Sequence, residues 1–418
     1  MLKKSEPIII SFLGFISGFT LMISGNTLNY WLAQEGVNLK VIGIFAFVSL
    51  PYAINFIWAP FFDSKELKLL SRYLEKRLAW IILIQIILAV FVLILSKIDL
   101  VTHLYLIAMV SFVISFLSSS QDALLGALRT EIIAKDAQGA ASGIYILGYR
   151  LGMLSSSSGA IYLSVHTSWQ NIYQIFAAII FAFPFILYLA MNILNKENLV
   201  RQVNIISKND DKHSSPLIQI LFHLKKISGL IWIIAFLILY RLPDNFINVM
   251  INPFLLHLGY NALEIASVGK FFGVTNAIIG GLLASWIMRK YSILNCLLFF
   301  GILHAIAHSL FILQELEGKN ISLLFIVIGF ESITGGMTMS AYIAFISSLC
   351  YGKYRATQYS FYSAMMGVSR SILPSFSGYL VLEFGWKIFF ISMSLVAVPS
   401  LFIISKLKNY SKKEQPVL

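Results

Sequence analysis

Charged side chains are scarce in this chain of 418 residues, of which Asp, Glu, Lys and Arg together make up only 12%. A soluble domain carries about 25% charged residues. Apolar residues make up 58% of the chain, more than a soluble core of this size needs to bury. In a bilayer, apolar side chains face lipid as well as one another. The composition therefore excludes an ordinary soluble protein and predicts an all-α membrane protein.

Several chemical signatures are also missing. The chain has two cysteines, Cys296 and Cys350, and their number and spacing support neither a disulfide framework nor a cysteine metal site. No glycine-rich phosphate loop ending in Lys-Ser or Lys-Thr is present, so the chain is not expected to hydrolyse ATP. No nucleophile and base form a convincing catalytic set at one depth. We expect no enzymatic activity and no cofactor.

Metal and nucleic-acid ligands are equally poorly supported. Among the seven histidines only His304 and His308 lie one helical turn apart, a spacing that could place two imidazoles on one ion. No carboxylate or cysteine lies near them in the sequence, so no metal site is predicted. The net charge of +12 comes from basic residues in short connections between apolar runs, not from a face or arm that could follow phosphates. We predict no nucleic-acid partner.

Long apolar runs dominate the chain. A spanning helix needs about 20 mostly apolar residues, and twelve such runs are present. They cover residues 7–33, 41–62, 78–96, 101–121, 140–165, 171–194, 229–257, 264–288, 292–312, 321–349, 357–382 and 386–405. The first run is too long for a signal peptide and no small-residue cleavage site follows it, so we expect it to be retained as a helix.

Lys and Arg set the expected orientation. With the N-terminus inside, the inside segments hold 23 of the 31 basic residues and the outside loops hold 4. An excess of Lys and Arg marks cytoplasmic loops. Both termini are therefore predicted to be cytoplasmic, in a multi-pass membrane protein.

The chain divides into two halves with internal similarity. We predict an N-terminal six-helix lobe over 1–194, a cytoplasmic linker over 195–228, a C-terminal six-helix lobe over 229–405 and a tail over 406–418. Gln138 precedes Arg150 by the same interval that separates Gln358 from Arg370, and a tryptophan follows each arginine, Trp169 in the first half and Trp386 in the second. The segment that starts at Trp31 and ends at Asn38 parallels the segment from Phe254 to Asn261. Parallel repeats of this kind indicate two pseudo-symmetric lobes of the major facilitator type.

Charged residues inside the apolar runs are candidates for function, because a charge at the bilayer centre costs about 2.5–3.5 kcal/mol on insertion scales. The predicted substrate contacts are Arg150, Arg370, Gln121, Lys270 and Asn26; the predicted proton-coupling acids are Asp122, Asp244 and Glu331. Together they suggest a cationic cavity for an anionic substrate, with acids that take up and release protons. Asn26, near the outer end of the first run, could donate to a sugar hydroxyl.

Structural roles remain open for the same groups. Arg241 and Asp244 lie three residues apart, hence on one helix face, and could form a static ion pair. Asp122 could pair with Arg129 as a latch between the lobes.

The connection after the second run has Asp63 followed by Arg72, an acid at a helix end followed by bases. Such bases can bind acids and helix carbonyls when one side of a transporter closes. The predicted gating residues are Asp63, Arg72, Arg129 and Arg241. The basic residues of this connection could equally serve only to set topology.

Short motifs in both halves resemble the muropeptide permease (AmpG) family of the major facilitator superfamily. They include Ser120-Gln-Asp122, Leu147-Gly-Tyr-Arg-Leu-Gly-Met-Leu154, Phe330-Glu331 and Ala356-Thr-Gln358, in a resemblance that runs from about residue 10 to 400. The resemblance implies a proton-driven importer of N-acetylglucosaminyl-anhydromuramyl peptides for peptidoglycan recycling. The family usually has a second acid four residues after Asp122, where this chain has Gly126.

Two kinds of transporter are therefore expected. The first is the muropeptide symporter, a monomer embedded in the bilayer whose partners are the anionic glycopeptide and protons. The alternative is a transporter of another organic anion, such as a nucleotide- or CoA-linked solute. A membrane sensor would need a sizeable soluble domain, and the 195–228 linker is too short to be one.

Overall fold

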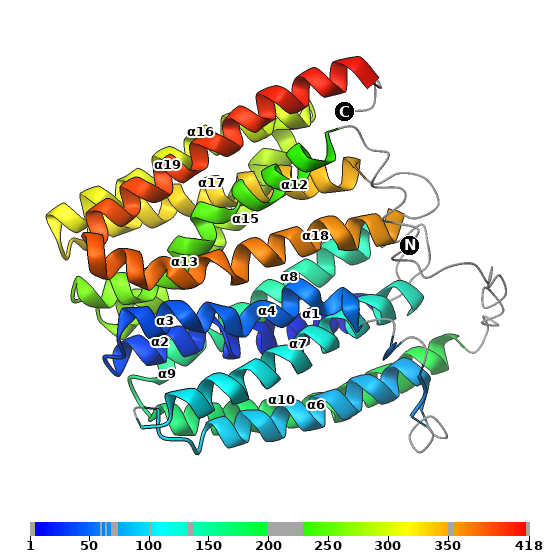
Figure 1. Cartoon of the computed structure of the whole chain (residues 1–418). Helices are drawn as coiled ribbons and strands as arrows, with labels where there is room; N and C mark the ends of the chain where they lie inside the picture. The colour runs from blue at the N-terminus through cyan, green and yellow to red at the C-terminus, as the bar shows by residue number, and fades with distance from the viewer. Residues whose placement is uncertain are drawn as a thin grey trace.

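The computed structural model describes residues 5–58, 61–62, 65–67, 74–100, 102–132, 138–198, 229–349 and 355–414. All regular secondary structure in these residues is helical, as predicted. The helices run roughly along one direction, and both chain ends lie at the same end of the bundle (Figure 1). Within this part of the chain nine helices are long and apolar enough to cross a membrane.

The first half of the chain forms the lower layer in Figure 1. Its helices are α1 (Glu6–Ile23), α2 (Asn26–Gln34), α3 (Leu39–Ile44), α4 (Leu50–Ile54), α6 (Lys76–Leu95), α7 (Leu104–Ile132), α8 (Gln138–Ser156), α9 (Ser158–Leu163) and α10 (Trp169–Asn198).

The second half forms the upper layer, coloured from green to red. Its helices are α12 (Leu230–Leu239), α13 (Leu242–His257), α14 (Ala262–Glu264), a π-helix (Ile265–Phe272), α15 (Gly273–Ile287), α16 (Ile293–Glu317), α17 (Ile321–Ser348), α18 (Arg355–Ser371) and α19 (Ser377–Glu414).

Each predicted apolar run coincides with one or more of these helices, but several boundaries differ. α7 continues to Ile132 instead of ending at 121, because Leu124, Leu125 and Leu128 keep a buried apolar face through the next turns. α10 extends to Asn198, into the predicted linker, and α19 extends to Glu414, through most of the predicted tail. The rest of the predicted linker, 199–228, lies outside the described residues.

Equivalent aromatic contacts occur in the two layers. Trp31 and Trp169 stack with their ring centroids 5.8 Å apart. Their counterparts in the repeat are Phe254 and Trp386, whose centroids lie 5.2 Å apart. The same packing between equivalent positions supports two lobes built on one repeated plan.

Glycines bring α1 and α8 into backbone contact. A Cβ added at Gly148 would lie 1.9 Å from the Ser11 carbonyl oxygen, and one at Gly18 would lie 2.0 Å from the Tyr149 carbonyl oxygen. Glycines spaced four residues apart are typical of close helix crossings in membranes, where packing rather than water drives association. In the second lobe Gly280 and Gly336 join α15 to α17 in the same way.

Substituting Gly148 by alanine is expected to lower the free energy of unfolding by about 1–3 kcal/mol, because the added methyl group must push two backbones apart. Thermal unfolding of the purified protein in detergent measures the effect. Gly126→Ala is the matched control, since no atom lies within 4 Å of a Cβ there. An unchanged midpoint for Gly148→Ala would contradict the packing described.

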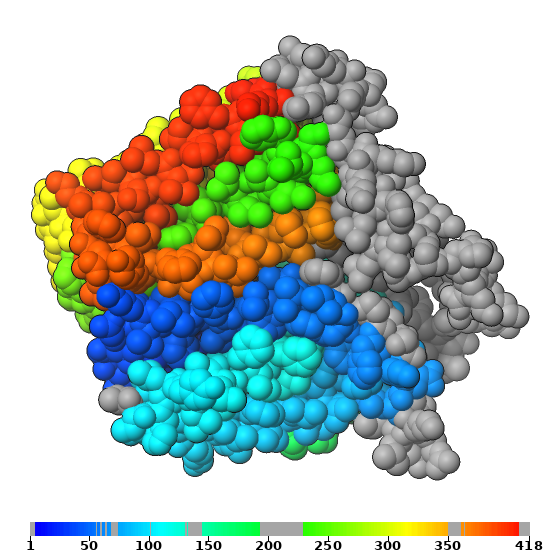
Figure 2. All heavy atoms as spheres, viewed as in Figure 1, coloured from blue at the N-terminus to red at the C-terminus, as the bar shows by residue number. Residues whose placement is uncertain are grey.

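Contacts between the lobes gather at the end of the bundle opposite the chain ends. There α2 packs on α13, α3 on α19, and α9 on the π-helix and α14. α18 also packs along α4, with the Ser49 and Ser371 hydroxyl oxygens 3.0 Å apart. Figure 2 shows the orange surface of α18 lying directly on the blue surface of the first lobe, with no opening along this seam.

Candidate functional site

A cavity of about 420 Å³ lies between the two lobes, within the size range of small-molecule sites. Four basic and two acidic side chains line it. They are Arg150, Arg241, Lys270, Arg370, Asp244 and Glu331. The structure thus brings together six of the charged residues that the sequence singled out, in a cavity with an excess of positive charge.

Arg150 and Arg370 reach the cavity from opposite lobes. Arg150 lies on α8, just before the break between α8 and α9, and Arg370 lies one residue before the end of α18. Neither guanidinium forms an ion pair with an acid among the residues that the structure describes; Arg370 acts on Asp122 only through a longer-range electrostatic interaction. Both cations therefore keep hydrogen-bond donors for a ligand in the cavity.

The packing explains why Arg150 sits within a glycine motif. Gly148 and Gly152 hold α8 against the backbone of α1. Arg150, midway between the two glycines, points away from that contact and lines the cavity. This close approach fixes the position of the Arg150 backbone at the cavity wall.

A break in the predicted run 229–257 positions Arg241 and Asp244. α12 ends at Leu239, and Arg241 is the residue before the first turn of α13. Pro243 explains the break, because proline has no N–H to donate and its ring clashes with the carbonyl four residues earlier. Asp244 then lies in the first turn of α13, where the helix dipole favours a negative charge.

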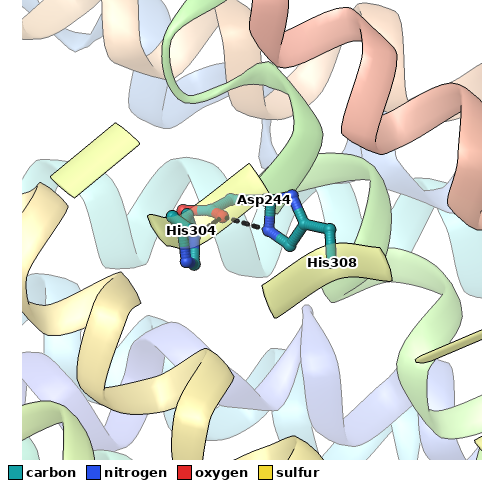
Figure 3. Close-up of side chains that lie close together, drawn as sticks. All are labelled: Asp244, His304 and His308. Carbon is teal, nitrogen blue, oxygen red and sulfur yellow. Dashed lines mark hydrogen bonds and ion pairs between the residues drawn. The ribbon is translucent and has the colours of Figure 1, made fainter. Parts of the chain in front are cut away.

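Asp244 is the centre of a buried polar cluster (Figure 3). One carboxylate oxygen pairs with Arg241. The other, Oδ1, contacts His304 Nε2 and lies 3.1 Å from His308 Nε2. Asp244 and His304 are each 5% exposed and His308 is 1% exposed. The ion pair that the sequence allowed between Arg241 and Asp244 is therefore present, with two imidazoles added.

The same three residues offer one possible metal-ligand atom each, all within 4.8 Å of one another. Both oxygens of the carboxylate are already engaged, however, and one of them by the Arg241 cation. A metal ion on Oδ1 would place a second positive charge beside the Arg241 cation that already pairs with the same carboxylate. We therefore interpret the cluster as a hydrogen-bond network and not as a metal centre.

Glu331 lies beside this cluster on α17. Its Oε2 accepts a hydrogen bond of 3.1 Å from the Ser332 hydroxyl. A Cβ built on Gly335 would lie 3.3 Å from His304 Cε1 and 3.9 Å from Glu331 Oε1, so the glycine separates the imidazole from the carboxylate. Glu331 therefore lines the cavity and lies near the buried His304, with Gly335 between them.

Asn26 and Lys270 join the lobes at one edge of the cavity. Lys270 Nζ donates to Asn26 Oδ1 over 2.8 Å, and Asn252 Nδ2 donates to the same oxygen over 3.0 Å. The π-helical turn that carries Lys270 is a geometry often found at functional sites. Asn26 also lines the cavity, but in this structure its side-chain oxygen is occupied by the other lobe.

Gln121 and Asp122 lie apart from the cavity lining, on α7. Gln121 is fully buried, and its Nε2 donates to the Thr20 hydroxyl over 3.2 Å. The buried Oδ1 of Asp122 has no hydrogen-bond partner among the described residues. The Ser17 hydroxyl interacts with the carboxyl group through a hydrogen bond, and Arg370 attracts it over a longer distance. Because α7 continues past 121, Asp122 is an interior residue of that helix and does not close it.

Of the predicted gating residues, Arg129 and Arg241 lie in the described part of the chain, and only Arg241 of these two lines the cavity. The Arg129 guanidinium carbon lies 4.8 Å from the centroid of the Tyr145 ring in the same lobe, and it forms no ion pair with Asp122 in this structure. Asp63 and Arg72 lie outside the described residues.

Sequence reasoning missed three residues of the site. His304 and His308 were set aside because no acid is near them in sequence, yet Asp244, 60 residues before His304, meets both. Asn252 was not singled out either, although it is fully buried. The only available signal for the histidines was their spacing of one helical turn within an apolar run.

Comparison with known proteins agrees with this architecture. The family model described as Major Facilitator Superfamily matches residues 10–315 and 296–417. A Rickettsia bellii (strain RML369-C) protein described as transporter AmpG 1 is 55% identical over 96% of this chain and 98% of its own length. The anhydromuropeptide permease of Escherichia coli (strain K12) is 30% identical over 96% of this chain and 79% of its own length.

A solved structure of a point mutant of the nucleoside transporter NupG superposes with a TM-score of 0.70. It is 15% identical in sequence, and the match covers 96% of this chain and 99% of that one. At this identity the likeness concerns the fold alone.

Proposed function

Because the chain belongs to the Major Facilitator Superfamily and, within it, to the AmpG family of transporters, we propose that this multi-pass membrane transporter imports muropeptides. The proposed substrates are N-acetylglucosaminyl-anhydromuramyl peptides, recovered for peptidoglycan recycling. Uptake is driven by protons that move in the same direction. The protein acts as a monomer in the inner membrane, with twelve spans in two six-helix lobes and both termini cytoplasmic.

One observation carries the substrate class. Arg150 and Arg370 occupy equivalent repeat positions in the two lobes, line one cavity, and have no ion-pair partner among the described residues. A peptide carboxylate can accept bidentate hydrogen bonds from a guanidinium. A ligand held by both arginines joins the two lobes, which is the condition for substrate binding to affect their relative movement.

The proposed proton sites lie among these acids and the groups hydrogen-bonded to them. Asp244 and Glu331 line the cavity, and Asp122 has an unpartnered buried oxygen. An acid in a pocket of low dielectric changes its charge when a neighbouring charge arrives or leaves. With the termini cytoplasmic, the contacts among α2, α13, α3 and α19 close the outer side of the cavity in this structure. The clamp formed by Asn26, Asn252 and Lys270 belongs to that closure.

Uptake of a labelled anhydromuropeptide tests the proposal, in cells that lack their own permease and carry this chain. We expect accumulation that collapses when a protonophore is added. Accumulation that persists with the protonophore would contradict proton coupling. If the protein is present in the membrane and no label enters, the substrate assignment fails, and competition by nucleotide- or CoA-linked anions becomes the next measurement.

A further inference from the structure

We propose that His304 carries the coupling proton and that the Thr334 hydroxyl, by rotating, satisfies its hydrogen bonds in both charge states. This inference rests on the proton coupling proposed above and names the group that binds the proton. Neither residue lines the central cavity, although both lie next to residues that do.

The hydrogen-bond partners of His304 determine which of its two ring nitrogens always bears a hydrogen. Nε2 faces Asp244 Oδ1, and Asp244 is held as a carboxylate by Arg241 on its other oxygen. An ionised carboxylate only accepts hydrogen bonds. His304 Nε2 therefore bears a hydrogen whether the ring is neutral or charged, and Nδ1 is the nitrogen that gains or loses the proton.

The partner of Nδ1 can serve both states. The Thr334 hydroxyl oxygen lies 2.8 Å from His304 Nδ1 and 2.8 Å from the Phe330 carbonyl oxygen. When Nδ1 is bare, the hydroxyl donates to it. When Nδ1 is protonated it donates to the hydroxyl oxygen, whose single hydrogen turns to Phe330. A proton can thus enter or leave while His304 Nδ1 and the Thr334 hydroxyl stay hydrogen-bonded to each other.

His308 differs in this respect. Its Nε2 donates to Asp244 over 3.1 Å, but its Nδ1 is buried and has no hydrogen-bond partner in the structure. A second proton on this ring would place an unpaired N–H in the protein interior, which is costly. His308 is therefore a neutral positioning residue that holds the Asp244 carboxylate.

Charges from every neighbouring helix act on His304. Asp244 lies in the first turn of α13, and Arg241 directly precedes that helix. Tyr240 follows the end of α12, and His308 lies one turn after His304 on α16. Glu331 approaches from α17, on the other side of Gly335. With His304 charged, two cations, Arg241 and His304, lie beside the Asp244 carboxylate. An anion bound by Arg150 and Arg370 favours that charged state, and the charged state favours the anion in return.

Two spaces meet at the cluster. Asp244 and Glu331 line the central cavity, whereas both histidines line a separate cavity of about 10 Å³ that also touches Tyr240 and Ser400. That volume is near the minimum for one water molecule. His304 therefore lies between the substrate cavity and a second small space that could hold one water molecule.

Two measurements on the full chain test the inference. In the first, nitrogen-15 NMR of histidine-labelled protein in detergent follows the ring nitrogens between pH 5 and 8, and His304→Gln assigns the His304 signals. We expect Nδ1 of His304 to gain a proton as the pH falls while His308 stays neutral. This readout needs no substrate, so it stands even if the proposed substrate is wrong. A His304 ring that keeps one state throughout would overturn the inference.

The second measurement uses liposomes with a clamped membrane potential and a labelled anhydromuropeptide. A pH step of one unit can drive about tenfold accumulation per proton. We expect His304→Gln to lose this accumulation but to retain counterflow at equal pH. Thr334→Val should behave in the same way, and Thr334→Ser, which keeps the hydroxyl, should accumulate normally. The matched control is His257→Gln, a histidine that packs on Trp386 outside the cluster.

The outcomes separate the two proposals. pH-driven accumulation that survives both His304→Gln and Thr334→Val overturns the role of His304 and leaves proton coupling in place. Loss of counterflow together with accumulation in both variants assigns them a purely structural role and also overturns it. If the unchanged chain shows counterflow but no response to the pH step, proton coupling itself fails, and the role of His304 fails with it.

Discussion

Replacing Arg150 or Arg370 by glutamine is expected to weaken binding of the anionic substrate by about 2–5 kcal/mol, the usual cost of removing one partner of a buried charged hydrogen bond. Both guanidinium groups line the cavity and lack an ion-pair partner among the described residues. Neither substitution breaks an ion pair with an acid among the described residues, although Arg370→Gln also removes a longer-range attraction to Asp122. Binding should fall while the fold is kept.

Isothermal titration of the purified variants with an anhydromuropeptide measures this loss, and thermal unfolding checks the fold. Arg289→Gln is the matched control, because this arginine is exposed after α15 and lies outside the cavity lining. We expect it to bind like the unchanged chain. Full affinity in both Arg150→Gln and Arg370→Gln would contradict the assigned binding site, whichever organic anion is transported.

Replacing Arg241 by methionine is expected to lower the free energy of unfolding by about 3–5 kcal/mol, because it leaves the charge of Asp244 without its cation. Asp244 is only 5% exposed. Because the carboxylate is nearly buried, water replaces the lost guanidinium only poorly, and the cost should exceed that of a surface ion pair such as Lys40 with Glu383, which is exposed on both sides.

Adding Asp244→Asn to Arg241→Met should restore most of that stability, since the double variant buries no unpaired charge. Thermal unfolding of the two single variants and the double variant in detergent forms the required cycle. The double variant should still be defective in pH-driven accumulation, because the carboxylate that orients His304 is gone. Strictly additive losses of stability would show that Arg241 and Asp244 do not depend on each other.

Much of the architecture follows from the order of residues alone. The twelve apolar runs all fall on helices in the described residues, because only a backbone that satisfies its own hydrogen bonds is stable among apolar side chains. The repeat that relates Trp31 to Phe254 and Trp169 to Trp386 was visible in sequence, and both pairs are in contact. The charged residues that are candidates for function could also be named, since intramembrane charge is costly and rarely without a role.

Boundaries and breaks were harder to predict. α7 runs on to Ile132, where polar residues had suggested an end, because one of its faces remains buried. The break before α13 depends on Pro243, yet Pro184 lies inside α10 and Pro399 lies inside the part of α19 that follows the kink at Gly385. Hydropathy averages over all faces of a helix, so it cannot tell which face a neighbour will cover.

By itself, the sequence determined the all-helical class of this membrane protein and the list of costly charges, because each depends on local composition and spacing along the chain. Tertiary structure alone decided which charges meet. Asp244 joins two histidines some 60 residues away, Asn26 meets Lys270 across the lobes, and Gln121 turns inward to Thr20. Such contacts depend on which helix faces meet and on how each helix is rotated about its axis. The distances and angles that hydrogen bonds and ion pairs require are reached only after the helices have packed.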